Sequence, residues 1–201
     1  MPAFGASKEG AEYEVKAVFL LNFTRFVEWP ADEAKATQPF VIAVLGEDPF
    51  GSQLNEAVRG EKFGNRPIEI KRIATAEDAA SCGALFIARS EEPHLKNILR
   101  KFAGRPILTV SDIPDFAESG GMVEFVTEDS KIHFHINIDA AKAANLAVSA
   151  KLLRPAVIVK TRKTSLNNPA TTLFPSSLLV DKGLGPSNQI WPGADHETFL
   201  N

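Results

Sequence analysis

Three short apolar runs, each followed by a polar turn, stand out along the chain. They are residues 40–46 (FVIAVLG), 84–90 (ALFIARS) and 106–111 (PILTVS). Runs of this length, rich in β-branched residues, predict strands that are buried on both faces of a parallel sheet. We therefore expect Val41, Leu85 and Leu108 to be shielded from solvent.

Segments with other periodicities lie between these runs. Residues 52–58 and 91–102 repeat apolar positions every three or four residues, which predicts helices. Residues 68–73 alternate isoleucine with charged side chains, which predicts a further strand. Strands that alternate with helices predict the α/β class, here a three-layer sandwich with a mostly parallel central sheet.

The pattern changes over residues 120–138, where two alternating strands are separated by a turn at Asp129 and Ser130. This predicts a β-hairpin at one side of the sheet. Beyond it, the Ala-rich residues 140–153 predict a single helix with Asp139 as its N-cap, ending before Pro155.

The most apolar stretch, residues 15–30 (VKAVFLLNFTRFVEWP), precedes the first strand. Its uninterrupted apolar run covers only residues 17–21, whereas a membrane span needs about 20 mostly apolar residues. A secretion signal is disfavoured as well, because acidic residues precede the run where a signal peptide carries positive charge. We predict a helix over residues 13–29, ended by Pro30, in a chain that is not itself membrane-spanning.

This helix carries more large apolar side chains than one buried stripe requires. We expect one side to pack on the sheet and the other to meet a second subunit in a homodimer. The candidate interface residues are Phe19, Leu20, Phe23, Phe26 and Trp29. A helix that is buried entirely within its own subunit is the alternative.

The composition of the chain limits the kinds of protein to which it can belong. The 201 residues are 44% hydrophobic and 23% charged with a formal net charge of −3, which is typical of one α/β domain and gives no sign of nucleic-acid binding. The single cysteine, Cys82, excludes an intrachain disulfide. We place the domain at residues 11–160 and predict that the proline-containing extension at residues 161–201 is extended or disordered.

Polar residues follow the carboxyl ends of the three buried strands, the edge at which ligands of open α/β sheets bind. The candidate ligand-binding residues are Glu47, Asp48, Arg89, Ser90, Glu91, Ser111 and Asp112. The alternative is that Asp48 and Asp112 only cap the helices that follow. Because no phosphate-binding, dinucleotide or nucleophile motif accompanies them, we expect neither an enzyme nor a cofactor.

His133 and His135 share one face of a predicted strand. A zinc site needs at least one further ligand, which the sequence does not nominate nearby. A solvent-facing pair is the favoured interpretation, so no metal is expected.

The order and spacing of five blocks resemble those of the YfiR-like family. The blocks are VKAVFLLNFTRFVEWP, FVIAVLGEDPFG, ALFIARSE, ILTVSDIPDFAESGGMVEFV and KIHFHINIDAAKAANLAVSAKLL, and the resemblance extends over residues 13–159. Members of that family are periplasmic α/β domains. The best understood restrain a membrane-bound diguanylate cyclase by contacting its periplasmic sensor part, which lowers cyclic di-GMP and biofilm formation.

The resemblance implies a non-enzymatic periplasmic regulator with a cyclase as its partner, and a periplasmic small-molecule sensor without a cyclase partner is the alternative. The chain shows no secretion signal, so the periplasmic location rests on the resemblance. Family members often carry cysteines that can pair, whereas this sequence has one cysteine. Disulfide or redox behaviour is therefore not implied.

Overall fold

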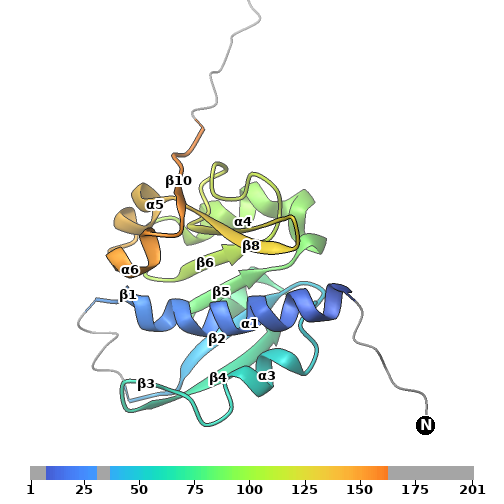
Figure 1. Ribbon diagram of the computed structural model, residues 1–201. Helices are drawn as coiled ribbons and strands as arrows, with labels where there is room; N and C mark the ends of the chain where they lie inside the picture. Colours follow the sequence, from blue (N-terminus) through green and yellow to red (C-terminus); the bar gives the residue numbers. More distant parts are fainter. Residues whose placement is uncertain (1–7, 31–36, 163–201) are drawn as a thin grey trace, which may run out of the picture. The chain divides into compact units, whose positions relative to one another are not determined.

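The computed structural model describes residues 8–30 and 37–162 as a mixed α/β fold. Eight strands form a curled sheet in the order β10-β8-β7-β6-β5-β2-β4-β3, with helices packed against it (Figure 1). Apart from its first two residues, the extension at 161–201 lies outside the described residues.

The three apolar runs form the centre of the sheet. β2 (Phe40–Leu45), β5 (Ala84–Ile87) and β6 (Leu108–Ser111) pair in parallel, and β4 (Arg66–Ile73) pairs in parallel with β2. Val41 is 7% exposed, and neither Leu85 nor Leu108 has any exposed surface. The burial predicted from the continuous apolar pattern is therefore confirmed.

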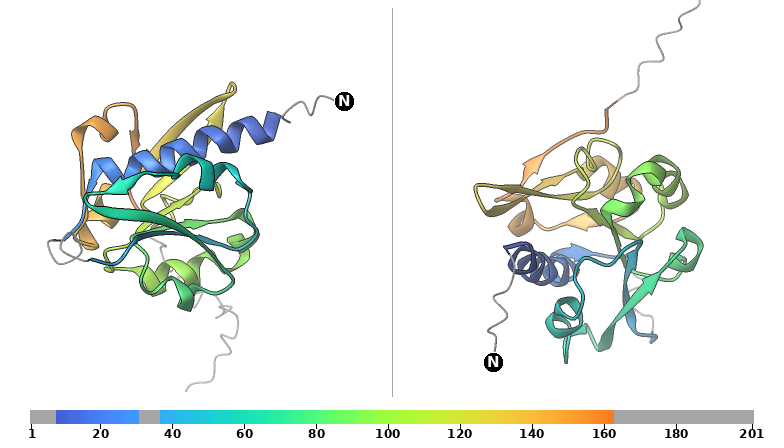
Figure 2. Two further views of the ribbon diagram at one scale, coloured as in Figure 1. Left: turned by 90° about the horizontal axis from the view of Figure 1, so that it is seen from below. Right: turned by 90° about the vertical axis from the view of Figure 1, so that its right-hand side faces the viewer.

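Each face of the sheet carries its own hydrophobic core. Because side chains alternate along a strand, Ile42 and Val44 lie in one core, whereas Ala43 and Leu45 lie in the other. The first core is covered by α1 (Lys8–Phe26) and α3 (Gln53–Ala57), and the second by η1 (Ala76–Ala79) and α4 (Leu95–Phe102), which follows η2 (Arg89–His94). Figure 2 shows α1 and α4 on opposite faces of the sheet.

β7 (Val123–Glu128) and β8 (Lys131–Ile136) pair in antiparallel fashion and extend the sheet beyond β6. Their turn residues, Asp129 and Ser130, have φ angles of 48° and 63°. Short polar residues tolerate this left-handed conformation better than branched or bulky ones. The edge strand β10 (Val157–Ile158) lies outside β8, and β3 (Lys62–Phe63) forms the opposite edge.

The prediction of one helix over residues 140–153 with Asp139 as N-cap is wrong. The segment consists of α5 (Ile138–Ala143), β9 (Ala147–Val148) and α6 (Ala150–Leu153). Asn137 is the N-cap of α5, since its side chain accepts a hydrogen bond from the Ala140 N–H at 3.0 Å. Asn145 has a φ of 56°, Leu146 is buried, and β9 pairs with β1 (Val27–Glu28). These tertiary contacts outweigh the helix propensity of the alanines.

Candidate functional site

A lysine lies on the buried face of α1. Lys16 precedes Leu20 by four residues and Phe23 by seven, so helical geometry places the three side chains on one face. None of the three has exposed surface. A lysine in a hydrophobic core requires a compensating charge, because an isolated buried ammonium is costly.

Asp112, which directly follows β6, supplies that charge. The Lys16 Nζ lies 2.8 Å from Asp112 Oδ2, and the Tyr13 hydroxyl donates to the same oxygen at 2.8 Å. The Arg89 Nε, which follows β5, lies 3.4 Å from it. We call Tyr13, Lys16, Arg89 and Asp112 the Asp112 cluster. It joins α1 to the carboxyl ends of two central strands.

The cluster perturbs the titration of its neighbours. Burial raises the pKa of the Tyr13 hydroxyl, and the hydrogen bond to the Asp112 carboxylate raises it further. Burial also opposes ionisation of Glu12, but hydrogen bonds from Lys16 and Thr127 and the charge of Lys16 outweigh it, so the pKa of Glu12 is lowered. Lys16 Nζ, at 2.6 Å from Glu12 Oε1, is thus held between two carboxylates.

The geometry of this cluster is that of an internal anchor. The Lys16 side chain has no exposed surface and that of Asp112 is 1% exposed, so neither is open to a substrate in this conformation. Neither carboxylate oxygen of Asp112 caps a following helix. One of them, Oδ2, contacts Tyr13 and Lys16 of α1 and Arg89. The other, Oδ1, is buried without a hydrogen-bond partner among the described residues.

The structure brings together the strand ends that the sequence marked as a ligand-binding rim. The Glu47 N–H donates to Ser90 Oγ at 2.9 Å, and Arg89 reaches Asp112. Asp48 is committed to the turn that follows β2, since its carboxylate accepts from the Phe50 N–H at 2.8 Å and from Arg72 at 2.7 Å. Asp48 thus caps the turn and not the helix that follows, because the N-cap of α3 is Ser52.

The remaining rim residues divide into buried and accessible ones. Ser111 is buried, donates to the Ile87 carbonyl at 2.7 Å and accepts from the Ile113 N–H at 3.0 Å. Glu91 Oε2 lies 3.5 Å from His94 Nδ1. Glu47, Arg89 and Ser90 are exposed. Ligand binding by this rim stays a prediction.

The sequence did not nominate the α1 members of the cluster. A signal for Lys16 existed, because it lies at helical spacing from Leu20 and Phe23 on a face predicted to be buried. No sequence pattern identifies its partner, since Asp112 is 96 positions away.

α1 packs most of the proposed interface residues inside the protein itself. Leu20 and Phe23 have no exposed surface and Trp29 is 8% exposed, whereas Phe19 and Phe26 are half-buried. Phe23 stacks on Phe125 with ring centroids 5.5 Å apart. The apolar excess of α1 is therefore largely explained by its own core, and a subunit contact through this helix stays a prediction.

Further observations concern metal binding and membrane crossing. His133 is exposed and His135 Nδ1 lies 3.9 Å from Glu124 Oε2. Within residues 8–30 and 37–162, no three His, Cys, Asp or Glu side chains converge as metal ligands. In the same part of the chain, no helix combines the length and apolarity that a membrane crossing requires.

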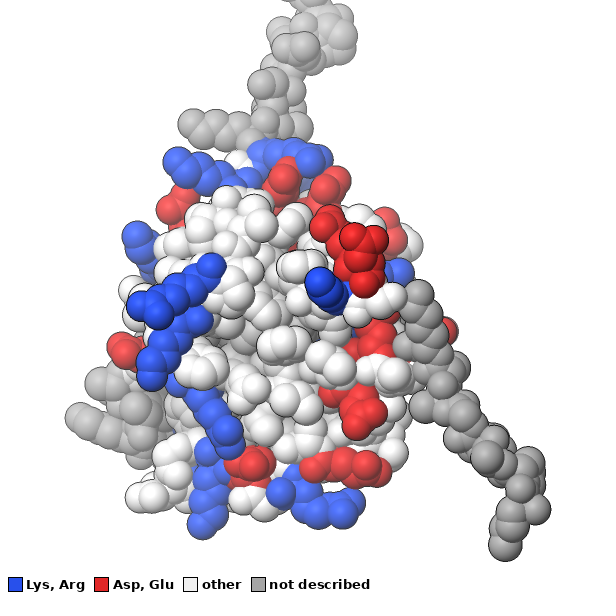
Figure 3. All heavy atoms as spheres, in the orientation of Figure 1, with Lys and Arg blue, Asp and Glu red and all other residues white. Residues whose placement is uncertain are grey.

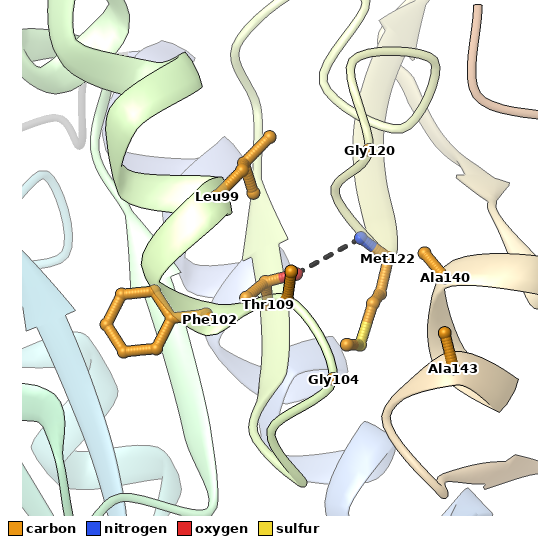
Figure 4. Close-up of a pocket in the computed structure, with 9 residues that line it drawn as sticks. Leu99, Phe102, Gly104, Thr109, Gly120, Met122, Ala140 and Ala143 are labelled. Atoms are coloured by element: carbon orange, nitrogen blue, oxygen red, sulfur yellow. Dashed lines mark hydrogen bonds between the residues drawn. The ribbon is translucent and has the colours of Figure 1, made fainter. Parts of the chain in front are cut away.

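A small cavity of about 160 Å³ lies between α4, α5 and the segment that leads into β7 (Figure 4). Its lining is mainly apolar: Leu99, Phe102, Ala103, Gly104, Thr109, Gly120, Met122, Ala140 and Ala143. The Thr109 hydroxyl accepts a hydrogen bond from the Met122 N–H at 3.1 Å.

Comparisons with known proteins agree with this fold. The crystal structure of "the ABC domain in complex with L-Trp from Streptococcus pneumonia" is similar with a TM-score of 0.51 at 9% identity, over 71% of this chain and 60% of that chain. At this identity the likeness shows the fold alone, and the chain spans less than two thirds of that structure's length. A search of curated proteins gives no match. Residues 13–157, from α1 to β10, match the YfiR/HmsC-like family, and the chain therefore belongs to the YfiR/HmsC-like family.

Proposed function

We propose that the protein is a non-enzymatic periplasmic regulator that binds and restrains a membrane-bound diguanylate cyclase, and thereby lowers cyclic di-GMP and biofilm formation. The observation that carries this proposal is the family match, which covers residues 13–157 and hence almost all of the described fold. The family is regulatory rather than catalytic.

The geometry of the polar residues supports a binding role rather than chemistry. Lys16, Ser111 and Asp112, which catalysis at the strand ends would need to expose, are buried and committed to internal bonds. Catalytic groups in contrast must reach a substrate within hydrogen-bonding distance. The side of α1 that faces away from the sheet keeps apolar side chains available to another protein, with Val15 and Val18 at 45% and 47% exposure.

The test is co-expression of the protein in the periplasm beside its native membrane cyclase, with cyclic di-GMP measured by mass spectrometry. We expect a lower cyclic di-GMP level than with an unrelated periplasmic protein at equal expression. An unchanged level with both proteins folded and present would contradict the proposal.

A periplasmic small-molecule sensor without a cyclase partner is the second candidate, and the cavity of Figure 4 favours it. This pocket is partly open to solvent, and its volume is close to that of an apolar cavity of about 150 Å³, which can accept a benzene-sized molecule. Thermal-shift screening of small aromatic and aliphatic compounds tests this function. A hit that the cavity-filling substitution Ala143→Leu abolishes would support it, and the absence of any hit would count against it.

A further inference from the structure

A groove on the outer side of α1 is open to solvent. It lies between the first half of α1 and the turn end of β8 and has a volume of about 500 Å³. Its apolar floor consists of Ala11, Val15, Phe19 and Ile132, and the hydrogen bond of 2.8 Å from Thr127 to Glu12 joins its two sides. We call this feature the α1–β8 groove.

The floor of the groove is unusually exposed for this protein. Among the described residues, the large hydrophobic side chains with substantial exposure are Val15, Val18, Val157 and Ile158. Val15 lines the groove, and Val18, one helical turn further, continues its apolar surface along α1. Single exposed apolar residues need no explanation, but a contiguous apolar surface with a concave centre is typical of a binding site.

Acidic residues lie around the groove, although its own lining carries one acidic residue, Glu12, which is paired with Lys16, and one basic residue, Lys131. Glu9, Glu12 and Glu14 lie in the first turns of α1, and Glu128 and Asp129 lie at the β7–β8 turn. Figure 3 shows acidic side chains gathered along the side of the molecule where the start of α1 meets the β7–β8 turn. The exposed basic residue of the groove is Lys131, whereas the charge of Lys16 is compensated by Asp112.

These features define the chemistry of the occupant. An apolar floor binds apolar side chains, and acidic surroundings favour Lys or Arg next to them. The same charges repel an anionic membrane surface, which attracts basic protein segments instead. A groove of this volume suits the central anchor of a protein interface, in which a few buried side chains provide most of the binding energy.

We propose that the α1–β8 groove is the docking site for a basic amphipathic segment of a partner protein. The inference rests on the proposed function in one respect, namely that the protein acts by contacting another protein. It adds the surface that makes the contact and the chemistry of the segment that binds there.

The first experiment measures binding of a fluorescein-labelled synthetic helical Leu–Lys peptide to the purified full chain by fluorescence polarisation, with the matching Leu–Glu peptide as control. We expect the Leu–Lys peptide to bind at least about tenfold more tightly than the Leu–Glu peptide. Val15→Glu should weaken binding of the Leu–Lys peptide by at least about tenfold. Val157→Glu, a matched change at an exposed valine (53%) outside the groove, should leave it unchanged.

This design separates docking from unspecific charge attraction. Val15→Glu makes the protein more acidic, so a peptide held by charge alone would bind the variant equally well or more tightly, and that result would overturn the proposal. Glu128→Lys should weaken binding, whereas Glu69→Lys, an equal change of charge on β4, should not. Far-UV circular dichroism checks folding. If Val15→Glu fails to fold, Val15→Ser takes its place, because it removes the apolar contact without a charge.

The second experiment places the same variants in the cyclase assay. If wild type lowers cyclic di-GMP, Val15→Glu should lose this effect and Val157→Glu should retain it; equal activity of both variants would overturn the inference. If wild type has no effect, the proposed function fails and the peptide experiment alone decides on the groove. Sedimentation analysis identifies a second copy as occupant: a wild-type dimer that Val15→Glu converts to a monomer would overturn docking of a partner segment.

Discussion

Replacement of Lys16 by methionine tests whether the Asp112 cluster anchors α1 to the sheet. Methionine keeps an unbranched side chain and a good helix propensity but removes the ammonium group. Asp112, at 3% exposure, would remain buried with the Tyr13 hydroxyl as its close donor and Arg89 at 3.4 Å. The variant therefore leaves a buried carboxylate without adequate compensation.

The expected loss of stability follows from the burial of the Lys16–Asp112 ion pair. Loss of one partner of a buried ion pair costs about 3–5 kcal/mol. The contact with Glu12, whose side chain is 25% exposed, contributes much less, about 0.3–0.5 kcal/mol for an i,i+4 pair. Since domains are stable by about 5–15 kcal/mol, Lys16→Met should remove a large fraction of the free energy of unfolding.

The assay is equilibrium urea unfolding at neutral pH, followed by far-UV circular dichroism, for wild type, Lys16→Met, Asp112→Asn and the double variant. Asparagine keeps an oxygen that accepts from the Tyr13 hydroxyl but carries no charge. We expect the double variant to be less destabilised than the sum of the single variants, because no uncompensated charge remains.

Two results would refute this reasoning. A loss below about 1 kcal/mol for Lys16→Met, with an unchanged m-value, would show that the pair behaves like a surface ion pair. Strict additivity in the double variant would show that Lys16 and Asp112 do not interact energetically.

Three further predictions concern packing, pH and assembly. Gly121→Ala should destabilise the protein by about 1–3 kcal/mol in the same urea assay, because its Cβ would overlap the Phe116 ring; a loss below about 0.5 kcal/mol would contradict this. The lowered pKa of Glu12 means that its contribution to stability is complete above the unfolded value of 4.5 and is lost as the pH falls through the folded value. The stability difference between wild type and Glu12→Gln should therefore shrink as the pH is lowered below 4.5, and a difference that stays constant from neutral to acidic pH would be evidence against it. The homodimer predicted from the apolar surface of α1 is tested by analytical ultracentrifugation, and a monomer at every accessible concentration would rule it out.

The elements that could be predicted from sequence are those whose pattern is set by local burial. β2, β5 and β6 are continuous apolar runs because both faces of a central parallel strand are covered. The apolar part of α1 and the turn at Asp129 and Ser130 were equally readable, since helix periodicity and turn chemistry involve residues close in sequence. The predicted helix bounds, residues 13–29, were wrong at both ends, because α1 begins at Lys8 and ends at Phe26, after which Val27 and Glu28 form β1. Family resemblance added the regulatory class, which no local pattern shows.

Tertiary structure decided the features that depend on residues far apart in sequence. The alanines of residues 140–153 favour a helix locally, but burial of Leu146 and pairing of β9 with β1 interrupt it. The sequence placed Asp112 at a strand end yet did not show that Lys16 would meet it. Likewise, the helical pattern showed that α1 has more apolar side chains than one buried stripe requires, but not which of them are buried. Packing against the sheet and the hairpin buries Phe23 and leaves Val15 exposed. Three-dimensional contacts, rather than hydrophobicity, determine which side of a helix is covered.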